Sequence, residues 1–128
     1  MNIEMRRIIF LLLGIGLFFS CQKLDDNGDF GGYWKLLQIE DFEGDSIIDK
    51  RGEDRFWAVQ LDLIQIGTGK GRFQRTDDSL FIQMIYKTEK PEEYGLFHQE
   101  DASYCIEHLT NRSMGLRCNE ARLLFRKF

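Results

Sequence analysis

Alternating apolar and polar residues, interrupted by short clusters of Gly, Asp and Asn, run through the chain from Phe30 onward. A period of two with many β-branched and aromatic residues is typical of β-strands. In the segment from Arg55 to Ile66 the apolar positions change phase after Leu63, which indicates a bulge or a bend. The predicted strands are Tyr33–Glu40, Arg55–Ile66, Arg72–Arg75, Ser79–Tyr86, Tyr104–Leu109, Met114–Cys118 and Ala121–Phe128. The pattern predicts an all-β domain of about eight short strands.

The first twenty residues show a different pattern, that of a secretory signal peptide. Arg6 and Arg7 precede an unbroken apolar stretch of twelve residues, 8–19. A helix that spans a bilayer needs about 20 apolar residues, so this stretch is too short for a stable anchor. A buried helix of the domain is excluded because the polar, turn-forming residues 25–29 follow directly. Residues 1–20 are therefore predicted to be a cleavable signal peptide.

The end of that segment, Leu17-Phe18-Phe19-Ser20-Cys21, resembles a bacterial lipobox, in which a small residue precedes a Cys that becomes the lipidated N-terminus. The resemblance implies lipidation of Cys21 and a membrane anchor made of acyl chains, each buried methylene contributing about 0.8 kcal/mol. Residues 21–30 would then comprise the lipidated Cys and a flexible acidic tether.

The tether carries Lys23 followed by Asp25 and Asp26, which resembles the surface-export signals of lipoproteins from Gram-negative gut anaerobes. That resemblance implies a domain on the outer face of the outer membrane. A plain acidic linker would instead leave the domain in the periplasm. Both alternatives place an outer-membrane lipoprotein in the cell envelope.

The domain that follows, residues 31–128, opens with Gly32-Tyr33-Trp34, as the Gly-x-Trp motif opens lipocalins. The remaining blocks are similar to those of short lipocalin-like domains in lipoproteins of unknown function. Those blocks are Phe56–Leu61, Ser79-Leu80 and Leu123–Phe128. The resemblance implies a small antiparallel lipocalin-like (calycin-type) barrel, whose closure between the first and last strands is left open. In lipocalins an Arg of the last strand packs over the motif Trp, so the resemblance implies that Arg122 or Arg126 covers Trp34.

Composition narrows the range of partners. The 128 residues include 17 Lys and Arg against 21 Asp and Glu, a net charge of −4. This balance offers no basic excess for nucleic-acid phosphates, so no nucleic-acid partner is expected. With 43% hydrophobic and 13% aromatic residues, the chain supports one modest core.

Two binding functions from different classes fit such a domain. In the first, the barrel holds a small apolar or aromatic ligand between rings. The rings expected to line this site are Trp34, Phe56, Trp57, Phe73, Phe81 and Tyr86. In a barrel this short the same rings can fill the interior. The second function is therefore a cavity-less interaction protein or accessory subunit of the cell envelope, acting through the long 87–103 loop or an exposed sheet edge. Within that loop Pro91–Tyr94 favours a helical turn.

The two cysteines that remain beyond Cys21 form a candidate disulfide. Cys105 and Cys118 would face each other across a hairpin centred on Asn111 and Arg112, unless a bulge slips the register by one. An exported protein meets an oxidising environment, which permits the bond. Two buried thiols are the alternative.

Catalytic, metal and cofactor sites are not predicted. Cys105 and His108 point to opposite faces of a strand, and no paired ligand spacing occurs, so no metal is expected. Two carboxylate pairs, Asp77-Asp78 and Glu92-Glu93, lie in polar turns. A general acid needs burial to shift its pKa, and such turns do not provide it. The glycine-rich run 67–71 precedes a strand rather than a helix, which indicates a hairpin and not a phosphate loop. We therefore expect a protein that is not an enzyme.

Overall fold

The computed structural model describes residues 27–128. The predicted signal peptide, the lipidation site Cys21 and the export signal at 23–26 lie outside the described residues. Within the described part there are two 3₁₀ turns and nine strands. These are η1 (Gly28–Phe30), β1 (Gly32–Asp41), β2 (Ser46–Asp49), β3 (Phe56–Gln60), β4 (Leu63–Ile66), β5 (Gly69–Arg75), β6 (Ser79–Tyr86), η2 (Pro91–Tyr94), β7 (Ala102–Leu109), β8 (Ser113–Arg117) and β9 (Ala121–Lys127).

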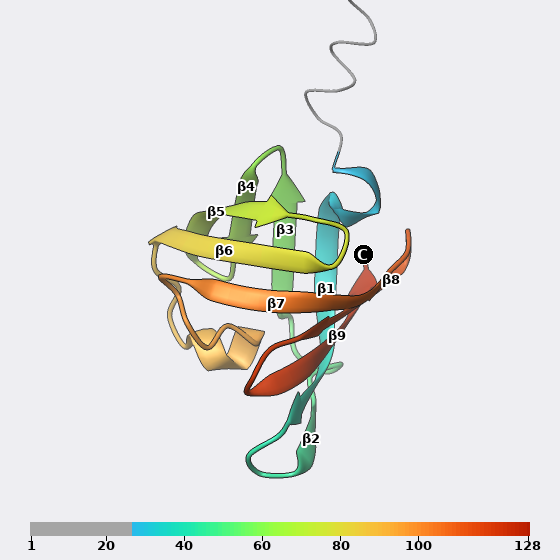
Figure 1. Cartoon of the computed structure of the whole chain (residues 1–128). Helices are drawn as coiled ribbons and strands as arrows, with labels where there is room; N and C mark the ends of the chain where they lie inside the picture. Colours follow the sequence, from blue (N-terminus) through green and yellow to red (C-terminus); the bar gives the residue numbers. More distant parts are fainter. Residues whose placement is uncertain (1–26) are drawn as a thin grey trace, which may run out of the picture.

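The strands form one antiparallel sheet that closes on itself as a barrel (Figure 1). Strands β3 to β9 pair in chain order, and β1 joins β3 on one side and β9 on the other. The β1–β9 pairing runs from Trp34 opposite Lys127 to Asp41 opposite Ala121. The closure that the sequence left open is therefore complete, and the barrel has eight strands.

Strand β2 is an addition to the barrel wall. The first part of β1 pairs with β3, and its last residues, Gln38 to Asp41, pair with β2. The β1–β2 hairpin extends below the barrel in Figure 1, and β2 has a strand neighbour on one side only. This strand was not predicted from the sequence.

The segment predicted as one bent strand, Arg55–Ile66, is two strands. A turn at Leu61 and Asp62 joins β3 to β4, and Val59 pairs with Ile64 across it. Leu61 has a φ of 56°, the left-handed conformation that Gly or Asn adopts more readily. The prediction of a single strand was wrong because this turn contains neither Gly, Pro nor Asn.

The core fills the inside of the barrel, because alternate residues of each strand point inward. In β6, for example, Leu80, Ile82 and Met84 are buried, as the alternation predicted. At Gly71 the neighbouring strand β6 leaves no room for a side chain, because a Cβ atom would lie 2.4 Å from the carbonyl oxygen of Gln83. Nineteen apolar residues form one continuous buried cluster.

Short segments cover both ends of the barrel. At the end where β1 begins, the fully buried Phe30 of η1 packs edge-on against Phe73, with ring centroids 5.1 Å apart. At the other end η2 confirms the predicted helical turn, and the buried Leu96 follows it. The Tyr104 hydroxyl donates a hydrogen bond to the Gly95 carbonyl at 2.7 Å, which ties this segment to β7. The interior is thus closed at the sides and at the ends.

Candidate functional site

The two tryptophans predicted to contact a ligand belong to the core. Trp34 and Trp57 are both fully buried. The Trp34 indole N–H donates to the Phe30 carbonyl at 2.8 Å, so its polar group is satisfied within the protein. The Trp57 ring lies 4.8 Å from the Phe125 ring and 5.8 Å from the Tyr104 ring, measured between centroids. These contacts occupy the space that an internal ligand would need.

The other four predicted rings do not share a cavity with the tryptophans. Phe81 and Tyr86 lie on the outside of β6, and 48% and 69% of their side chains are exposed. Phe73 packs under η1, and Phe56 packs edge-on against Phe128 at 5.2 Å between centroids. The six rings therefore do not form one internal binding site, which corrects the expectation from the sequence.

The cation over Trp34 is a lysine. Lys127 places its Nζ 4.7 Å from the ring centroid of Trp34 and donates a hydrogen bond to the Asp29 carbonyl at 2.7 Å. The prediction of Arg122 or Arg126 was wrong, because alternation in β9 turns these two side chains to the outside of the barrel.

Arg122 has a different role on the outer surface. It forms ion pairs with Glu107 at 2.6 Å and with Glu40 at 2.8 Å, and so links β9 to its neighbour β1 and, across β8, to β7. The hydrogen bond that Arg122 donates to the Glu107 carboxylate raises the pKa of the guanidinium above its usual value. The Arg122 side chain also lies 5.8 Å from the ring centroid of Phe42.

The two described cysteines are free thiols. A bulge in β7 between Ile106 and His108 shifts the register, so Cys105 pairs with Arg117 rather than with Cys118. The candidate disulfide is therefore not formed in this structure. Cys105 is exposed, whereas Cys118 is half-buried against the core, and burial raises the pKa of its thiol.

This difference predicts unequal reactivity. Iodoacetamide should modify Cys105 roughly ten-fold faster than Cys118, because the thiolate is the nucleophile and burial disfavours it. Peptide mass spectrometry of the folded protein at timed intervals would measure both rates. In the urea-unfolded chain the two rates should converge. Equal rates in the folded protein, or a disulfide that blocks both thiols, would contradict the structure.

Among residues 27–128, no group of three or more His, Cys, Asp and Glu side chains is arranged to hold a metal ion. The closest acid–base contact joins His98 Nε2 to Glu120 Oε1 at 2.6 Å on the surface. This hydrogen bond lowers the pKa of Glu120 below its usual value. Cys118, the thiol beside this pair, has a raised pKa because it is partly buried, which disfavours its nucleophilic thiolate form.

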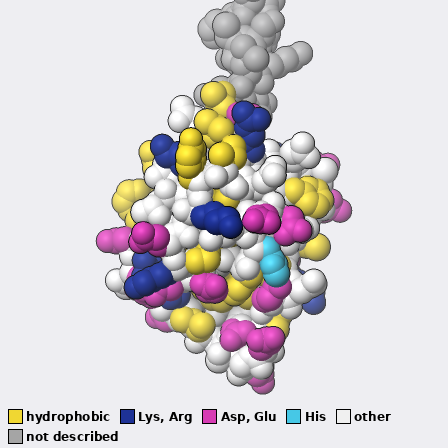
Figure 2. All heavy atoms as spheres, turned by 90° about the vertical axis from the view of Figure 1, so that its left-hand side faces the viewer, with side chains coloured by type: hydrophobic (Ala, Val, Ile, Leu, Met, Phe, Trp, Pro, Cys, Tyr) yellow, Lys and Arg dark blue, Asp and Glu magenta, His cyan; other side chains and the backbone are white. Residues whose placement is uncertain are grey.

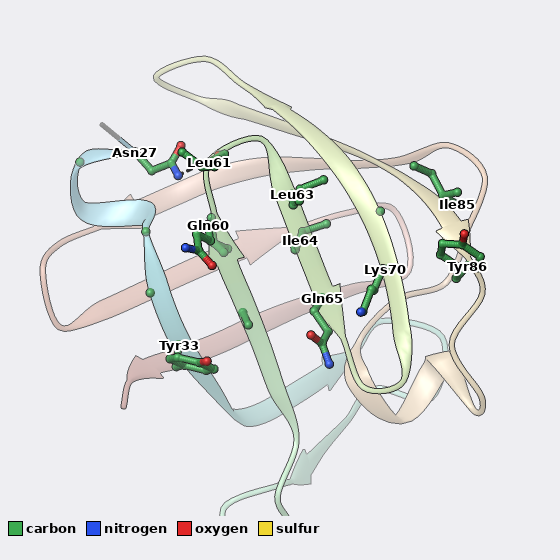
Figure 3. A pocket seen from close by; sticks show the side chains of 16 residues that line it. Asn27, Tyr33, Gln60, Leu61, Leu63, Ile64, Gln65, Lys70, Ile85 and Tyr86 are labelled. Atoms are coloured by element: carbon green, nitrogen blue, oxygen red, sulfur yellow. Dashed lines mark hydrogen bonds between the residues drawn. The ribbon is translucent and has the colours of Figure 1, made fainter. Parts of the chain in front are cut away.

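A depression on the outside of the barrel is a concave site among the described residues (Figure 3). It has a volume of about 960 Å³ and extends across the outer faces of β1, β3, β4, β5 and β6. The large apolar side chains that it exposes are Tyr33, Leu61, Leu63, Ile85 and Tyr86. Of the six predicted ligand residues, only Tyr86 lines it.

The polar groups of the depression are few. Among the described residues that line it, Lys70 is the one charged residue and none is Asp or Glu. Gln60 and Gln65 add amides, and the Gln65 amide donates to the Gly67 carbonyl at 3.3 Å. The Asn27 side chain donates to the Leu61 carbonyl at 2.8 Å and so holds the β3–β4 turn at the rim. The site can accommodate an apolar body with one anionic group beside Lys70.

Comparisons with known proteins agree with this architecture. The family model described as "Lipocalin-like domain" matches residues 16–128. A solved lipocalin-like protein from Bacteroides uniformis has 18% sequence identity and a TM-score of 0.64, and the match covers 79% of this chain and 100% of that one. An uncharacterized protein from Bacteroides eggerthii has 17% identity and a TM-score of 0.59, with 77% and 99% covered.

At these identities the two structures show a shared fold and carry no statement about a ligand. No curated protein matches the sequence. The family match spans the whole of the described barrel, including the Gly-x-Trp opening at Gly32 and the closing strand β9. The chain therefore belongs to the lipocalin-like domain family.

Proposed function

We propose that this protein is a lipoprotein of the outer membrane, held by acyl chains on Cys21 and carrying a non-enzymatic binding module. The basic n-region, the short apolar stretch and the Ser20-Cys21 junction support the anchor. Among the described residues, no helix is long and apolar enough to cross a membrane. The Lys23-Leu24-Asp25-Asp26 segment favours exposure at the cell surface over the periplasm.

The binding site of this module is the outer depression rather than the barrel interior. One observation carries this proposal: a concavity of about 960 Å³ with apolar walls and a single cation lies beside an interior that a continuous cluster of buried side chains already fills. Its chemistry fits a small, mostly apolar molecule that bears one negative charge. Leu63 and Tyr86 would contact the apolar body, and Lys70 the anionic group.

An experiment with 1-anilinonaphthalene-8-sulfonate tests this site, because the dye combines fused rings with one sulfonate. The chain from Gln22 onward contains the whole closed barrel and should bind the dye saturably. Leu63→Gln and Lys70→Met should each weaken binding about five-fold, equivalent to about 1 kcal/mol of lost apolar contact or ion pairing.

The matched control is Ile47→Gln, which makes the same kind of change at an exposed residue of β2. It should leave the dye affinity unchanged, as measured by fluorescence titration. Dye binding that is insensitive to changes at Leu63 and Lys70 would contradict the proposed site.

A second candidate function is protein binding through the free edge of β2. This strand has a neighbour on one side only, and 65% of the Ile47 side chain is exposed. The other surface considered from the sequence, the 87–103 loop, is less suited to docking. Thr88 and Gln99 exchange two hydrogen bonds, at 2.7 and 3.2 Å, which fix the loop across its base. Loss of partner capture in Ile47→Lys, with dye binding intact, would favour this second function.

A further inference from the structure

The depression lies next to the point at which the described chain begins. Asn27 lines it and binds the Leu61 carbonyl at 2.8 Å. Only five residues lie between Cys21 and Asn27, and an extended chain spans at most about 3.6 Å per residue. If Cys21 carries the proposed lipid anchor, on which the docking described below depends, the rim of the depression lies within about 20 Å of the membrane surface.

The β3–β4 turn at this rim exposes two leucines, one of them in a left-handed backbone conformation. Leu61 combines a φ of 56° with a side chain that is 44% exposed, and Leu63 two residues later is 50% exposed. Gly or Asn at position 61 would relieve the backbone strain. Because both leucines face solvent, only a surface outside the barrel can provide them with an apolar environment.

The other residues of the depression match the chemistry of a lipid surface. Tyr33 and Tyr86 present rings with exposed fractions of 62% and 69%, and such rings favour the headgroup level of a bilayer. Lys70, which forms no ion pair with an acidic side chain among residues 27–128, is suited to lipid phosphates. Asp62 follows Leu61 in the turn but does not line the depression.

Hydrophobic and acidic side chains gather at opposite ends of the molecule. Figure 2 shows hydrophobic side chains gathered at the upper end, where the described chain begins, and acidic side chains at the lower end. The lower end is the β1–β2 hairpin, whose loop contains Glu43 and Asp45. An anionic membrane would repel this hairpin and accept the opposite end.

We propose that the outer face of β1 and β3–β6 docks on the bilayer that anchors the protein. Leu61 and Leu63 reach the acyl boundary, the two tyrosines lie among headgroups, and Lys70 pairs with lipid phosphate. The ligand of the binding module is then a phospholipid of its own membrane, and the acidic hairpin points away from the surface.

The test uses the full-length, lipidated protein with a fluorescent reporter beside the turn. In a Cys105→Ser, Cys118→Ala background, Gln60→Cys is labelled with an NBD dye, which leaves both leucines in place. The protein is reconstituted in vesicles of phosphatidylethanolamine and phosphatidylglycerol with doxyl-labelled acyl chains. We expect about two-fold quenching at position 60 and none at a matched Ile47→Cys position on β2. Adding Leu61→Gln and Leu63→Gln should abolish the quenching.

Flotation of the same vesicles separates the two proposals. A protein that floats with the vesicles and carries the lipid mass on Cys21, yet shows equal quenching at positions 60 and 47, would overturn the docking inference and leave the anchor intact. A protein that neither floats nor carries that mass would overturn the anchor, and the docking inference with it. Circular dichroism of each labelled variant checks that the barrel is folded.

Discussion

Replacing Trp57 by alanine should lower the free energy of unfolding by about 3–5 kcal/mol. The indole is fully buried against Phe125 and Tyr104, so its removal leaves a cavity that the closed barrel cannot collapse around. It also leaves the Tyr94 carbonyl without the 2.9 Å hydrogen bond from the Trp57 N–H. A domain of this size is stable by only about 5–15 kcal/mol, so this loss is large. Urea denaturation followed by far-UV circular dichroism measures it.

Trp57→Phe is the matched control. It keeps most of the ring and should cost less than the alanine variant, mainly the hydrogen bond to Tyr94, about 1 kcal/mol. This series also tests where ligands bind. If Trp57→Ala were as stable as the natural chain but lost affinity for an apolar dye, the indole would line a ligand cavity, contrary to its assignment to the core.

Much of the barrel could be predicted from the sequence because inward and outward residues alternate along each strand. The strand Ser79–Tyr86 was predicted with its observed bounds, and its three inward residues are buried. The same alternation excludes part of the predicted ligand site. Phe81 falls between Leu80 and Ile82 and therefore has to point outward.

The side of strand β9 on which a residue lies decides which cation can cover Trp34. In β9, Phe125 points inward, so Lys127 shares its side of the strand while Arg122 and Arg126 do not. The family resemblance suggested the residue type, arginine, but the geometry of the strand selects the lysine. A count of positions from Phe125 would have identified it.

The outer depression could not be predicted, because its shape depends on how five strands curve after the barrel closes. Its residues are far apart in sequence, from Asn27 to Tyr86, and no motif joins them. The one available signal was the phase change after Leu63, since that change exposes Leu61 and Leu63 together. It was interpreted as a bend because the turn lacks the usual turn-forming residues.

Leu96→Ala should cost about 2–5 kcal/mol of stability, although the residue lies in the long loop between β6 and β7. Its side chain is 0% exposed, and the chain around it is held by the Tyr104 hydroxyl bond to Gly95. The loop thus covers one end of the barrel as part of the core. An interaction loop would instead tolerate this change and lose only its partner. Thermal and urea denaturation distinguish the two.

Leu63→Ala supplies the same chemical change at an exposed position of the depression. It should alter stability by no more than about 0.5 kcal/mol, because 50% of that side chain is already in water. Its effect should appear in dye binding and at the vesicle surface instead. If Leu96→Ala proved as mild as Leu63→Ala, the loop would not be part of the barrel core, and partner binding through residues 87–103 would regain support. If it proves severe, the binding surface has to lie elsewhere, and the depression beside Asn27 is the site that combines concavity, exposed apolar side chains and a cation.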